Sequence, residues 1–491
     1  MSANLIQLVS RLSYTLMQGS LEREITDLVY DSRKVTEGSL FICITGAVSD
    51  GHKYIPDVVA KGAAAIVVEQ DTKEYGIPAN VTVLKVANSR TALAELSAAW
   101  FGHPAEQLTT IGVTGTKGKT TTTYMMREMM EHAGLKTGLI GTIEVIIGEK
   151  HIPAVNTTPE SYLVQKYFRD MVDAGIRYVV MEVSSQALKL ERVGGFTFDY
   201  GIFTNLEEDH IGGAEHPDMA DYIRCKGLLF QRCKLGLINA DADYLEEVMA
   251  GHTCPLESFG LNDNADLYAT DIRRVQRAGY LGVEYDLKGL EEYHVRVDIP
   301  GDFTVYNSLA AISLCRHLGV KQEDILAALD EIQVKGRLEI VSTPGEYTLM
   351  IDYAHNAMSL EALLVNIRKY GPKRIICLFG CGGNRAKSRR YEMGEVSSRL
   401  ADLTVVTSDN PRNEEPMDII NDILIGVHKA DGAYVTIPDR KEAIRYCMEQ
   451  GGEGDVIILA GKGHEDYQEI CGVKHHMDER ELIAEIIAES K

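Results

Sequence analysis

One glycine-rich stretch, residues 109–134, constrains the fold of this chain more than any other. It reads TTIGVTGTKGKTTTTYMMREMMEHAG. A run rich in β-branched residues comes first, a glycine-rich turn follows, and methionines then recur at helical spacing until Gly134. The stretch therefore predicts a short strand, a tight loop and an amphipathic helix.

This arrangement is typical of a loop that binds the phosphates of a nucleotide. Backbone N–H groups of such a loop, with the positive end of the following helix, surround phosphate oxygens. Lys119 would neutralise the β- and γ-phosphates, and the Thr120 hydroxyl would hold Mg²⁺. The usual pattern has glycine where this chain has Val113, because the glycines fall at Gly112 and Gly115 instead. A purely structural glycine turn is the alternative, and the Lys-Thr pair after the last glycine argues against it.

The length and charge of the chain limit its class. A chain of 491 residues is too long for one core, so several domains are expected. The 50 Lys and Arg residues against 72 Asp and Glu residues give a formal charge of −22. This balance argues against nucleic acid or an anionic membrane surface as the main partner.

Cysteine use and the first residues indicate the compartment. The nine cysteines show no paired C-x-x-C spacing, which favours a reducing environment. The first residues lack the features of a signal peptide, and no apolar run approaches the roughly 20 residues needed to span a bilayer. We therefore expect a cytoplasmic protein without membrane insertion.

Patterns of short strands, helices and linkers divide the chain into three α/β units. In the first unit, residues 1–106, a helix pattern ends at Gly62 and a buried strand follows at 64–68. Residues 107–333 and 334–491 form the second and third units. We predict a central phosphate-loop domain with a doubly wound, mostly parallel sheet, and a C-terminal Rossmann-like α/β domain.

Polar residues follow several of the predicted strands. Because ligands of such sheets bind at the carboxyl ends of the strands, these residues are candidates for a site. The strands are predicted at 178–183, 201–206 and 236–240 in the second unit, and at 347–353, 374–380, 403–407 and 456–460 in the third.

Single residues in the first two units are weaker signals. Ser32 and Arg33 follow a strand and could bind a phosphate, although a surface turn is the alternative. Glu182 follows the run YVVM, where a buried carboxylate is costly unless it binds a cation. An isolated His210 or Lys226 is usually a surface residue, but their shared position beyond the next strand favours a site.

Four polar loops follow the strands of the third unit. Each alone could be a solvated connection, but together they would line one edge of the sheet and could clamp a zwitterion. The loops contain Arg385, Asp409, Asn410, Arg412, Lys462, His464 and Glu465.

Taken together, these motifs resemble the Mur ligases, a family of peptidoglycan synthesis, over nearly the whole chain. The likeness is greatest to the branch that adds the third residue of the stem peptide. Twelve motifs in a fixed order make chance an implausible explanation. In order they are DSRKVTEGSLF, DGHKYIPDVVAKGAAAIVVE, TGTKGKTTT, NTTPE, EVSSQAL, FTNLEEDH, the CK of YIRCKGLLF, KGRLE, DYAHNAMSLE, FGCGGNRAKSRR, TSDNPRNEEP and AGKGHEDYQ.

The resemblance implies an ATP-dependent amide ligase. The carboxylate of UDP-N-acetylmuramoyl-L-alanyl-D-glutamate would be phosphorylated to an acyl phosphate, which the amine of an incoming diamino acid would attack. The implied cofactors are ATP, Mg²⁺ and carbon dioxide, the last as a carbamate on Lys226. Such a carbamate turns a cation into an anion that can help to hold a metal ion. We expect a monomer.

The resemblance also implies roles for individual residues, with Lys119, Glu182, His210 and Lys226 in catalysis. ATP would contact Gly115, Thr116, Lys117, Gly118, Lys119, Thr120, Thr121, Asn307, Arg337 and Asp352. The UDP-muramoyl-dipeptide would contact Ser32, Asn156, Thr157, Thr158, Ser184 and Arg192. The incoming amino acid would contact Arg385, Asp409, Asn410, Pro411, Arg412, Gly461 and Glu465. The metal ligands would be Thr120, Glu182, His210 and the Lys226 carbamate.

Arg412 favours meso-2,6-diaminopimelate over lysine as the added amino acid. Its planar pair of donors fits a carboxylate and would repel a bare ammonium group. The chain departs from the family pattern at residues 211–217, at Asn384 and at Met358, which leaves open a paralogue that adds L-lysine or another amino acid.

Two other classes remain to be weighed. A sister ligase of the folylpolyglutamate or cyanophycin type would share the phosphate loop and the modified lysine, but is not expected to carry DNPR together with GKGHE. A non-enzymatic nucleotide switch would have no need for Glu182, His210 and Lys226 together.

Overall fold

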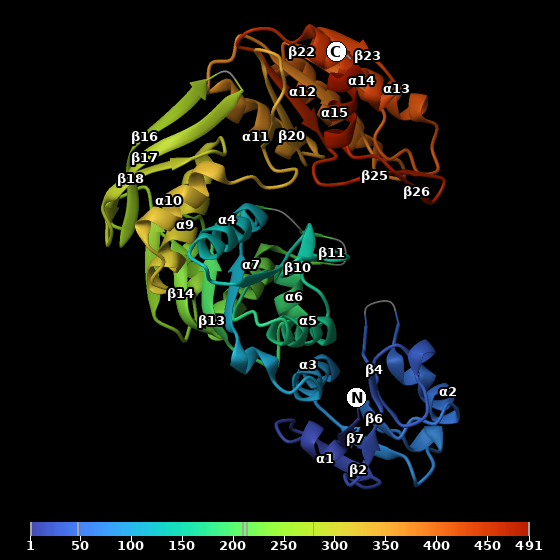
Figure 1. Cartoon of the computed structure of the whole chain (residues 1–491). Helices are drawn as coiled ribbons and strands as arrows, with labels where there is room; N and C mark the ends of the chain where they lie inside the picture. The colour runs from blue at the N-terminus through green and yellow to red at the C-terminus, as the bar shows by residue number, and fades with distance from the viewer. Residues whose placement is uncertain (1, 47–48, 209–210, 213–214, 278, 490–491) are drawn as a thin grey trace. The chain divides into compact units, whose positions relative to one another are not determined.

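The computed structural model describes residues 2–46, 49–208, 211–212, 215–277 and 279–489. The chain forms two compact units, whose bounds differ from those of the three units predicted from the sequence. The first compact unit comprises residues 1–260, 264–266 and 310–321, and the second compact unit comprises the rest. Helices and parallel strands alternate in both units (Figure 1), which confirms the predicted α/β class.

The N-terminal part of the first unit contains a five-stranded sheet in the order β2-β7-β6-β5-β4. Neighbouring strands of this sheet run parallel to each other, except that β2 runs antiparallel to β7. Leu40 and Ile42 pack on one face of the sheet, whereas Phe41 and Cys43 pack on the other, so both faces are buried. The strands are β2 (Thr15–Gln18), β4 (Asp27–Val29), β5 (Ser39–Ile42), β6 (Ala65–Val68) and β7 (Thr82–Lys85). The short strands β1 (Ala3–Asn4) and β3 (Glu24–Ile25) form a separate antiparallel pair. The helices are α1 (Leu5–Leu8), α2 (Ile55–Ala60) and α3 (Ser89–Trp100).

A second sheet of the first unit carries the glycine-rich loop. Within this unit its strand order is β11-β10-β9-β12-β8-β13-β14-β15, parallel from β9 to β15 with β10 and β11 antiparallel at one edge. The strands are β8 (Thr109–Thr114), β9 (Thr137–Ile140), β10 (Glu144–Ile147), β11 (Lys150–Pro153), β12 (Tyr178–Glu182), β13 (Phe198–Phe203), β14 (Cys233–Asn239) and β15 (Leu256–Gly260). The helices are α4 (Lys119–His132), α5 (Ser161–Asp173), α6 (Ser185–Lys189), α7 (Met219–Gly227) and α8 (Leu245–Met249).

The predicted strand, loop and helix around the glycine-rich stretch are confirmed as β8 and α4. The methionines of α4 are fully buried, and α4 contacts β8, β9 and β12. β13 differs from its prediction because it ends at Phe203, so Thr204 and Asn205 already belong to the loop beyond the strand. Their side chains bond to the backbone of the glycine-rich loop instead of continuing the strand.

The second unit contains a meander of three antiparallel strands and a mostly parallel sheet. The meander consists of β16 (Leu267–Arg277), β17 (Tyr280–Gly289) and β18 (Tyr293–Val297). The sheet order is β19-β20-β24-β21-β22-β23, parallel except at β19. Its strands are β19 (Glu339–Val341), β20 (Thr348–Asp352), β21 (Ile375–Phe379), β22 (Leu403–Val406), β23 (Tyr434–Thr436) and β24 (Val456–Ala460), followed by the hairpin β25 (Tyr467–Ile470) and β26 (Val473–His476).

Helices flank the sheet of the second unit. Leu349 and Ile457 pack with α14 and α15 in one hydrophobic cluster, while their neighbours Met350 and Ile458 point the other way and are also fully buried. The four strands predicted in this part of the chain are confirmed as β20, β21, β22 and β24. The remaining helices are α9 (Asp302–His317), α10 (Gln322–Glu331), α11 (Ala357–Arg368), α12 (Lys387–Leu400), α13 (Pro416–Val427), α14 (Arg440–Gln450) and α15 (Glu479–Glu489).

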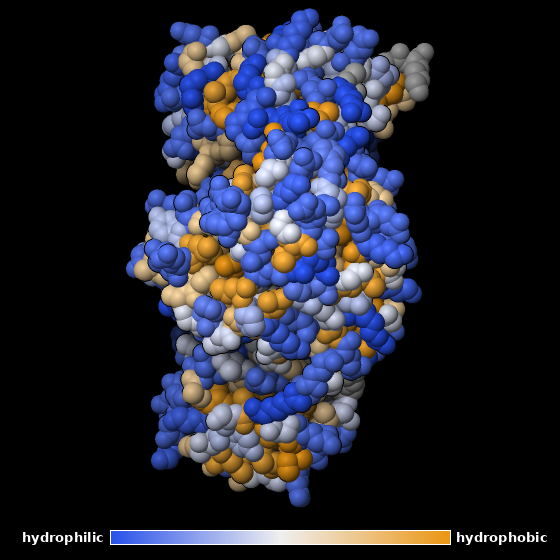
Figure 2. Space-filling view, turned by 90° about the vertical axis from the view of Figure 1, so that its left-hand side faces the viewer, coloured by the Kyte–Doolittle hydropathy of each residue, from blue (hydrophilic) through white to orange (hydrophobic). Residues whose placement is uncertain are grey.

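The surface is mostly hydrophilic. On the face shown in Figure 2, hydrophilic residues predominate and hydrophobic residues gather only in small groups. All nine cysteines are free thiols, eight of them buried. Among the helices that the structure describes, none is long and apolar enough to cross a membrane.

Candidate active site

The glycine-rich loop has the backbone geometry of a phosphate cradle. Gly115 has φ 154° and Gly118 has φ 83°, both in the region that favours glycine. A Cβ on Gly115 would lie 2.0 Å from Thr204 Oγ1, so no side chain fits there. Lys119 Nζ donates to the carbonyl oxygens of Gly115 (2.8 Å) and Thr116 (3.0 Å). The lysine therefore lies over the loop, where an incoming phosphate could replace these carbonyl oxygens.

The loop after β13 fixes the phosphate loop from the side. Thr204 Oγ1 and Asn205 Nδ2 both donate to the Lys117 carbonyl, at 2.8 and 3.0 Å. The Lys117 N–H donates to Asn205 Oδ1 at 2.9 Å, and the Thr116 N–H donates to the Asn205 carbonyl at 3.0 Å. These bonds hold the loop in one conformation, and a preorganised loop lowers the entropy cost of binding a ligand.

Glu182, at the end of β12, lies against the helix that follows the loop. Its side chain is 1% exposed, and both carboxylate oxygens accept from Thr120 Oγ1, at 3.0 and 3.1 Å. They also accept from Thr142, from the N–H at 2.8 Å and from Oγ1 at 2.9 Å. A carboxylate and a hydroxyl are oxygen ligands of the kind that Mg²⁺ takes, so Glu182 and Thr120 fit a magnesium site beside the phosphates.

The residues expected to bind the dipeptide gather around the end of β12. Thr158 Oγ1 donates to the Glu182 carbonyl at 2.8 Å and accepts from the Ser184 N–H at 3.1 Å. Thr157 Oγ1 lies 3.1 Å from Thr142 Oγ1. Arg192 donates to the Thr158 carbonyl at 3.3 Å. Asn156 is exposed at the start of this group.

Thr142 is a member of the site that sequence reasoning missed. It follows Gly141, where a Cβ would lie 2.6 Å from Glu182 Oε1, so a glycine is needed for the carboxylate to approach the backbone. The Gly-Thr pair directly after the strand β9 is the sequence signal that could have identified Thr142.

Lys226 is buried on α7 beside the phosphate loop. It is 1% exposed, and its Nζ lies 4.6 Å from the centre of the Tyr222 ring. The Tyr222 hydroxyl is 3.0 Å from Thr116 Oγ1 in the loop. A buried lysine is costly as a cation, and a carbamate would change the sign of its charge. His210, the other predicted metal ligand, lies outside the described residues.

A buried chain of hydrogen bonds links α6 to α7. Ser185 Oγ is 2.8 Å from His216 Nε2, and His216 Nδ1 is 2.8 Å from Asp221 Oδ2. Burial alone would raise the pKa of Asp221, but hydrogen bonds from Lys189 and Arg224 hold it well below its ordinary value. Lys189 and Arg224 already neutralise Asp221, and these hydrogen bonds fix α7, which carries Lys226, against α6.

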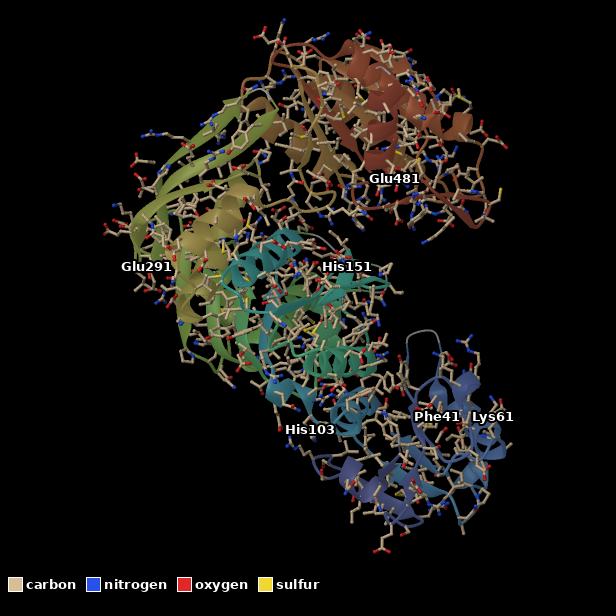
Figure 3. All side chains as sticks on the ribbon, viewed as in Figure 1. Phe41, Lys61, His103, His151, Glu291 and Glu481 are labelled. Atoms are coloured by element: carbon tan, nitrogen blue, oxygen red, sulfur yellow. The ribbon has the colours of Figure 1, made fainter. Side chains whose placement is uncertain are left out.

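The N-terminal part of the first unit has a pocket of about 530 Å³ around Ser32. Tyr30, Phe41 and Arg90 also line it. The Ser32 carbonyl accepts from Lys61 Nζ at 2.7 Å, and Figure 3 shows Lys61 and Phe41 in the same part of the chain. A hydrogen bond from Arg33 lowers the pKa of Asp31 to about 2. Aromatic and charged side chains therefore line the same pocket.

In the second unit, Asn410 connects the loops after β22 and β24. Its Oδ1 accepts from Lys462 Nζ at 3.0 Å, and its Nδ2 donates to Glu465 Oε2 at 2.9 Å. Lys462 is fully buried and also donates to Glu465 Oε2 at 3.0 Å. A Cβ on Gly461 would lie 3.2 Å from Asp409 Oδ2, so a glycine at this position allows the two loops to lie close together.

Arg412 lies in the same group. Its backbone has φ 52°, and its Nη1 donates to the Gly383 carbonyl at 2.7 Å. A Cβ on Gly383 would lie 1.9 Å from the Pro411 carbonyl, so the loops after β21 and β22 touch through their backbones. Arg385, from the loop after β21, is exposed. The structure thus brings together the predicted amino-acid-binding residues at one edge of this sheet.

The residues expected to meet the nucleotide in the second unit are Asn307, Arg337 and Asp352. The Asp352 carboxylate accepts from the N–H groups of Leu338 (2.9 Å) and Ala354 (2.8 Å), and burial raises its pKa. The Arg337 guanidinium lies 4.7 Å from the centre of the Tyr353 ring. Asn307 is buried on α9.

We expect His464 to make the stability of the second unit sensitive to acid. Burial, helped by the nearby Arg337, lowers its pKa from 6.5 to about 4. Between these values the unfolded chain binds a proton that the folded chain does not, so stability falls as the pH falls. From pH 7 to pH 5 we expect a loss of about 1–2 kcal/mol in the free energy of unfolding from this residue. Denaturant titrations of the wild type and of His464→Gln measure it.

The exposed His475 supplies the matched control for this prediction. His475→Gln should follow the wild type as the pH falls, whereas His464→Gln should lose less stability. Parallel curves for all three proteins would contradict the effect of His464.

Comparisons with known proteins show the family of this chain. The family descriptions "Mur ligase family, catalytic domain", "Mur ligase middle domain" and "Mur ligase, glutamate ligase domain" match residues 24–101, 113–315 and 336–463. Together they cover most of the chain. The chain therefore belongs to the Mur ligase family.

Relatives within the family share its whole length. A Clostridium acetobutylicum protein named UDP-N-acetylmuramoyl-L-alanyl-D-glutamate–2,6-diaminopimelate ligase 1 is 44% identical over 98% of this chain and 99% of its own. A Clostridium perfringens protein named as a ligase of the same kind is 40% identical over 98% of both chains. A solved structure of a ligase of that name has a TM-score of 0.74 and 26% identity, and covers 100% of this chain and 99% of its own.

Proposed function

We propose that this chain is an ATP-dependent ligase that joins meso-2,6-diaminopimelate to UDP-N-acetylmuramoyl-L-alanyl-D-glutamate in peptidoglycan precursor synthesis. The observation that carries the proposal is the group formed by the phosphate loop, Glu182 and the buried Lys226, in a chain that matches ligases of this name from end to end. A nucleotide switch would not need the last two residues.

The reaction would begin at the phosphate loop. Lys119 and the loop N–H groups would hold the triphosphate, and Mg²⁺, held by Thr120 and Glu182, would supply neutralising charge. The dipeptide carboxylate, oriented by Ser184 and its neighbours, would attack the γ-phosphorus to give an acyl phosphate and ADP. The amine of the diamino acid would then attack the acyl carbon, and phosphate would leave from the tetrahedral intermediate.

Three domains would share this work. Residues 1–106 would bind the UDP-linked substrate, residues 107–333 would bind ATP, and residues 334–491 would bind the amino acid. Carbon dioxide would be carried as the Lys226 carbamate. The working protein would be a cytoplasmic monomer that binds neither nucleic acid nor membrane.

A phosphate-release assay tests the proposal. Incubation with ATP, Mg²⁺ and UDP-muramoyl-dipeptide should release phosphate only when an amino acid is added, and meso-diaminopimelate should be the best one. Phosphate release that needs a folate or a preformed peptide would favour the sister ligases. Tight nucleotide binding without turnover would contradict the ligase.

A further inference from the structure

His216 lies in the segment 211–217, where the chain departs from the family pattern, and the proposed reaction gives it no role. Its ring is fully buried, and both ring nitrogens have partners. Nδ1 lies 2.8 Å from Asp221 Oδ2, and Nε2 lies 2.8 Å from Ser185 Oγ. The ring centre is 5.1 Å from that of Tyr222. Three side chains therefore meet around one buried imidazole.

Two of these partners belong to the elements that carry the expected magnesium ligands. Ser185 begins α6, three residues after Glu182 at the end of β12. Asp221 lies in the first turn of α7, and Lys226 lies in the last turn of the same helix. His216 thus bridges the element that carries Glu182 and the element that carries Lys226.

A second contact holds the same two helices, which pack against each other (Figure 1). Lys189, the last residue of α6, donates to Asp221 Oδ2 at 2.7 Å. Both ends of α6 therefore reach one carboxylate of α7, the far end directly and the near end through His216. Two separate contacts fix the rotation of α6 relative to α7 as well as its position, which one contact would not do.

The residue types of this chain also form the nucleophile triads of hydrolases, but its charges do not suit that role. In such a triad the carboxylate stabilises the protonated imidazole while the serine attacks. Asp221 is already bound by Lys189 at 2.7 Å and by Arg224 at 2.6 Å. Little of its negative charge is left for a third cation. The Ser185–His216–Asp221 chain is therefore suited to holding positions and not to transferring protons.

We propose that His216 is a positioning residue that sets the spacing of Glu182 and Lys226, and with it the affinity of the site for Mg²⁺. This inference rests on the proposed function. Mg²⁺ demands near-ideal placement of its ligands, so ligands on two separate elements need a rigid connection between those elements. Groups that orient metal ligands typically account for about 10- to 100-fold in metal affinity or activity.

Ser185→Ala and His216→Asn break the chain at the same contact. The first variant removes the hydroxyl, whereas the asparagine amide can still donate to Asp221 but is too short to reach Ser185. We expect each variant to bind Mn²⁺, which takes oxygen ligands as Mg²⁺ does, about tenfold more weakly in the presence of ADP. Electron paramagnetic resonance of the free ion measures this binding without turnover.

Phosphate release by the same variants should fall by a similar factor at limiting Mg²⁺ and recover at high Mg²⁺. A purely structural role would lower the melting temperature and leave the metal affinity of the folded protein unchanged. Thermal melting checks that each variant is folded. Ser185→Ala removes a single oxygen atom, so it provides the test if His216→Asn does not fold.

The double variant distinguishes a connected chain from two separate effects. If the chain acts as a unit, Ser185→Ala combined with His216→Asn should bind Mn²⁺ no more weakly than the weaker of the two single variants. His317→Gln is the matched control, because His317 of α9 lies in the same unit and its Nε2 is 3.1 Å from Glu257 Oε2. It should bind Mn²⁺ as the wild type does.

Wild-type Mn²⁺ affinity in the folded single variants would overturn the inference, and so would additive losses in the double variant. Covalent labelling of Ser185 by a sulfonyl fluoride, detected by mass spectrometry, would also overturn it, because Ser185 would then be a nucleophile. If the wild type itself binds no Mn²⁺ with ADP and releases no phosphate with any amino acid, the proposed function fails instead.

Discussion

Replacing Lys226 by alanine is expected to abolish turnover, with a loss of at least about a thousandfold in kcat. This is as large as, or larger than, the loss in kcat when an enzyme loses one group that stabilises the charge of its transition state. Lys226 is 1% exposed and lies beside Tyr222, whose hydroxyl contacts the phosphate loop. A permanent cation near the phosphate loop could not help to hold Mg²⁺, whereas a carbamate would bring an anion there. Acetate, formate or bicarbonate should partly restore the alanine variant, because each can supply the missing carboxylate. Steady-state phosphate release with and without these additives measures both effects.

Lys166→Ala supplies the matched control for Lys226→Ala. Lys166 is a half-exposed lysine of α5 in the same unit that pairs with Asp170. It should keep wild-type activity and show no response to added carboxylates. Near-normal turnover of Lys226→Ala without any additive would disprove the role of a carbamate.

The sequence predicted most of the framework of this site, because strand ends and glycine turns carry local signals. β8, α4, β12 and four of the six strands of the C-terminal sheet were found from apolar runs followed by polar or glycine-rich loops. Thr204 and Asn205 are polar residues near the end of a predicted strand, but the sequence did not show that they hold the phosphate loop. That contact joins residues almost ninety positions apart, and no local pattern contains it.

The meander β16–β18 was missed, although β17 carries a clear alternating signal. Leu281, Val283, Tyr285 and Leu287 are all fully buried, at every second position. The expectation of alternating helices and parallel strands over residues 107–333 obscured this pattern.

The charged partners of the amino-acid-binding residues were missed for a different reason. Glu469 lies 57 residues after Arg412, and only the pairing of the hairpin with the loop after β22 brings them together.

The choice of amino acid depends most on Arg412. Arg412→Ala is expected to lose about 1.5–3 kcal/mol of transition-state binding with meso-diaminopimelate, which is about 10- to 150-fold in kcat/KM. The guanidinium is pre-oriented by the Gly383 carbonyl and by Glu469, so a bound carboxylate would meet donors that are already in place. Arg412→Lys keeps the charge without the planar pair of donors and should lose much of the same energy. Competition between meso-diaminopimelate and lysine in one reaction measures the change in selectivity.

Arg399→Ala is the control, because this exposed arginine of α12 pairs with Glu361 and not with the amino-acid-binding residues. It should leave kcat/KM unchanged for both amino acids. If Arg412→Ala also leaves selectivity unchanged, a different cation, such as the exposed Arg385, must bind the distal carboxylate. If the wild type uses lysine faster than meso-diaminopimelate at equal concentration, the assignment of the amino acid is wrong. The phosphate loop, Glu182 and Lys226 would still support a ligase, because they act on the acyl phosphate and not on the distal end of the incoming residue.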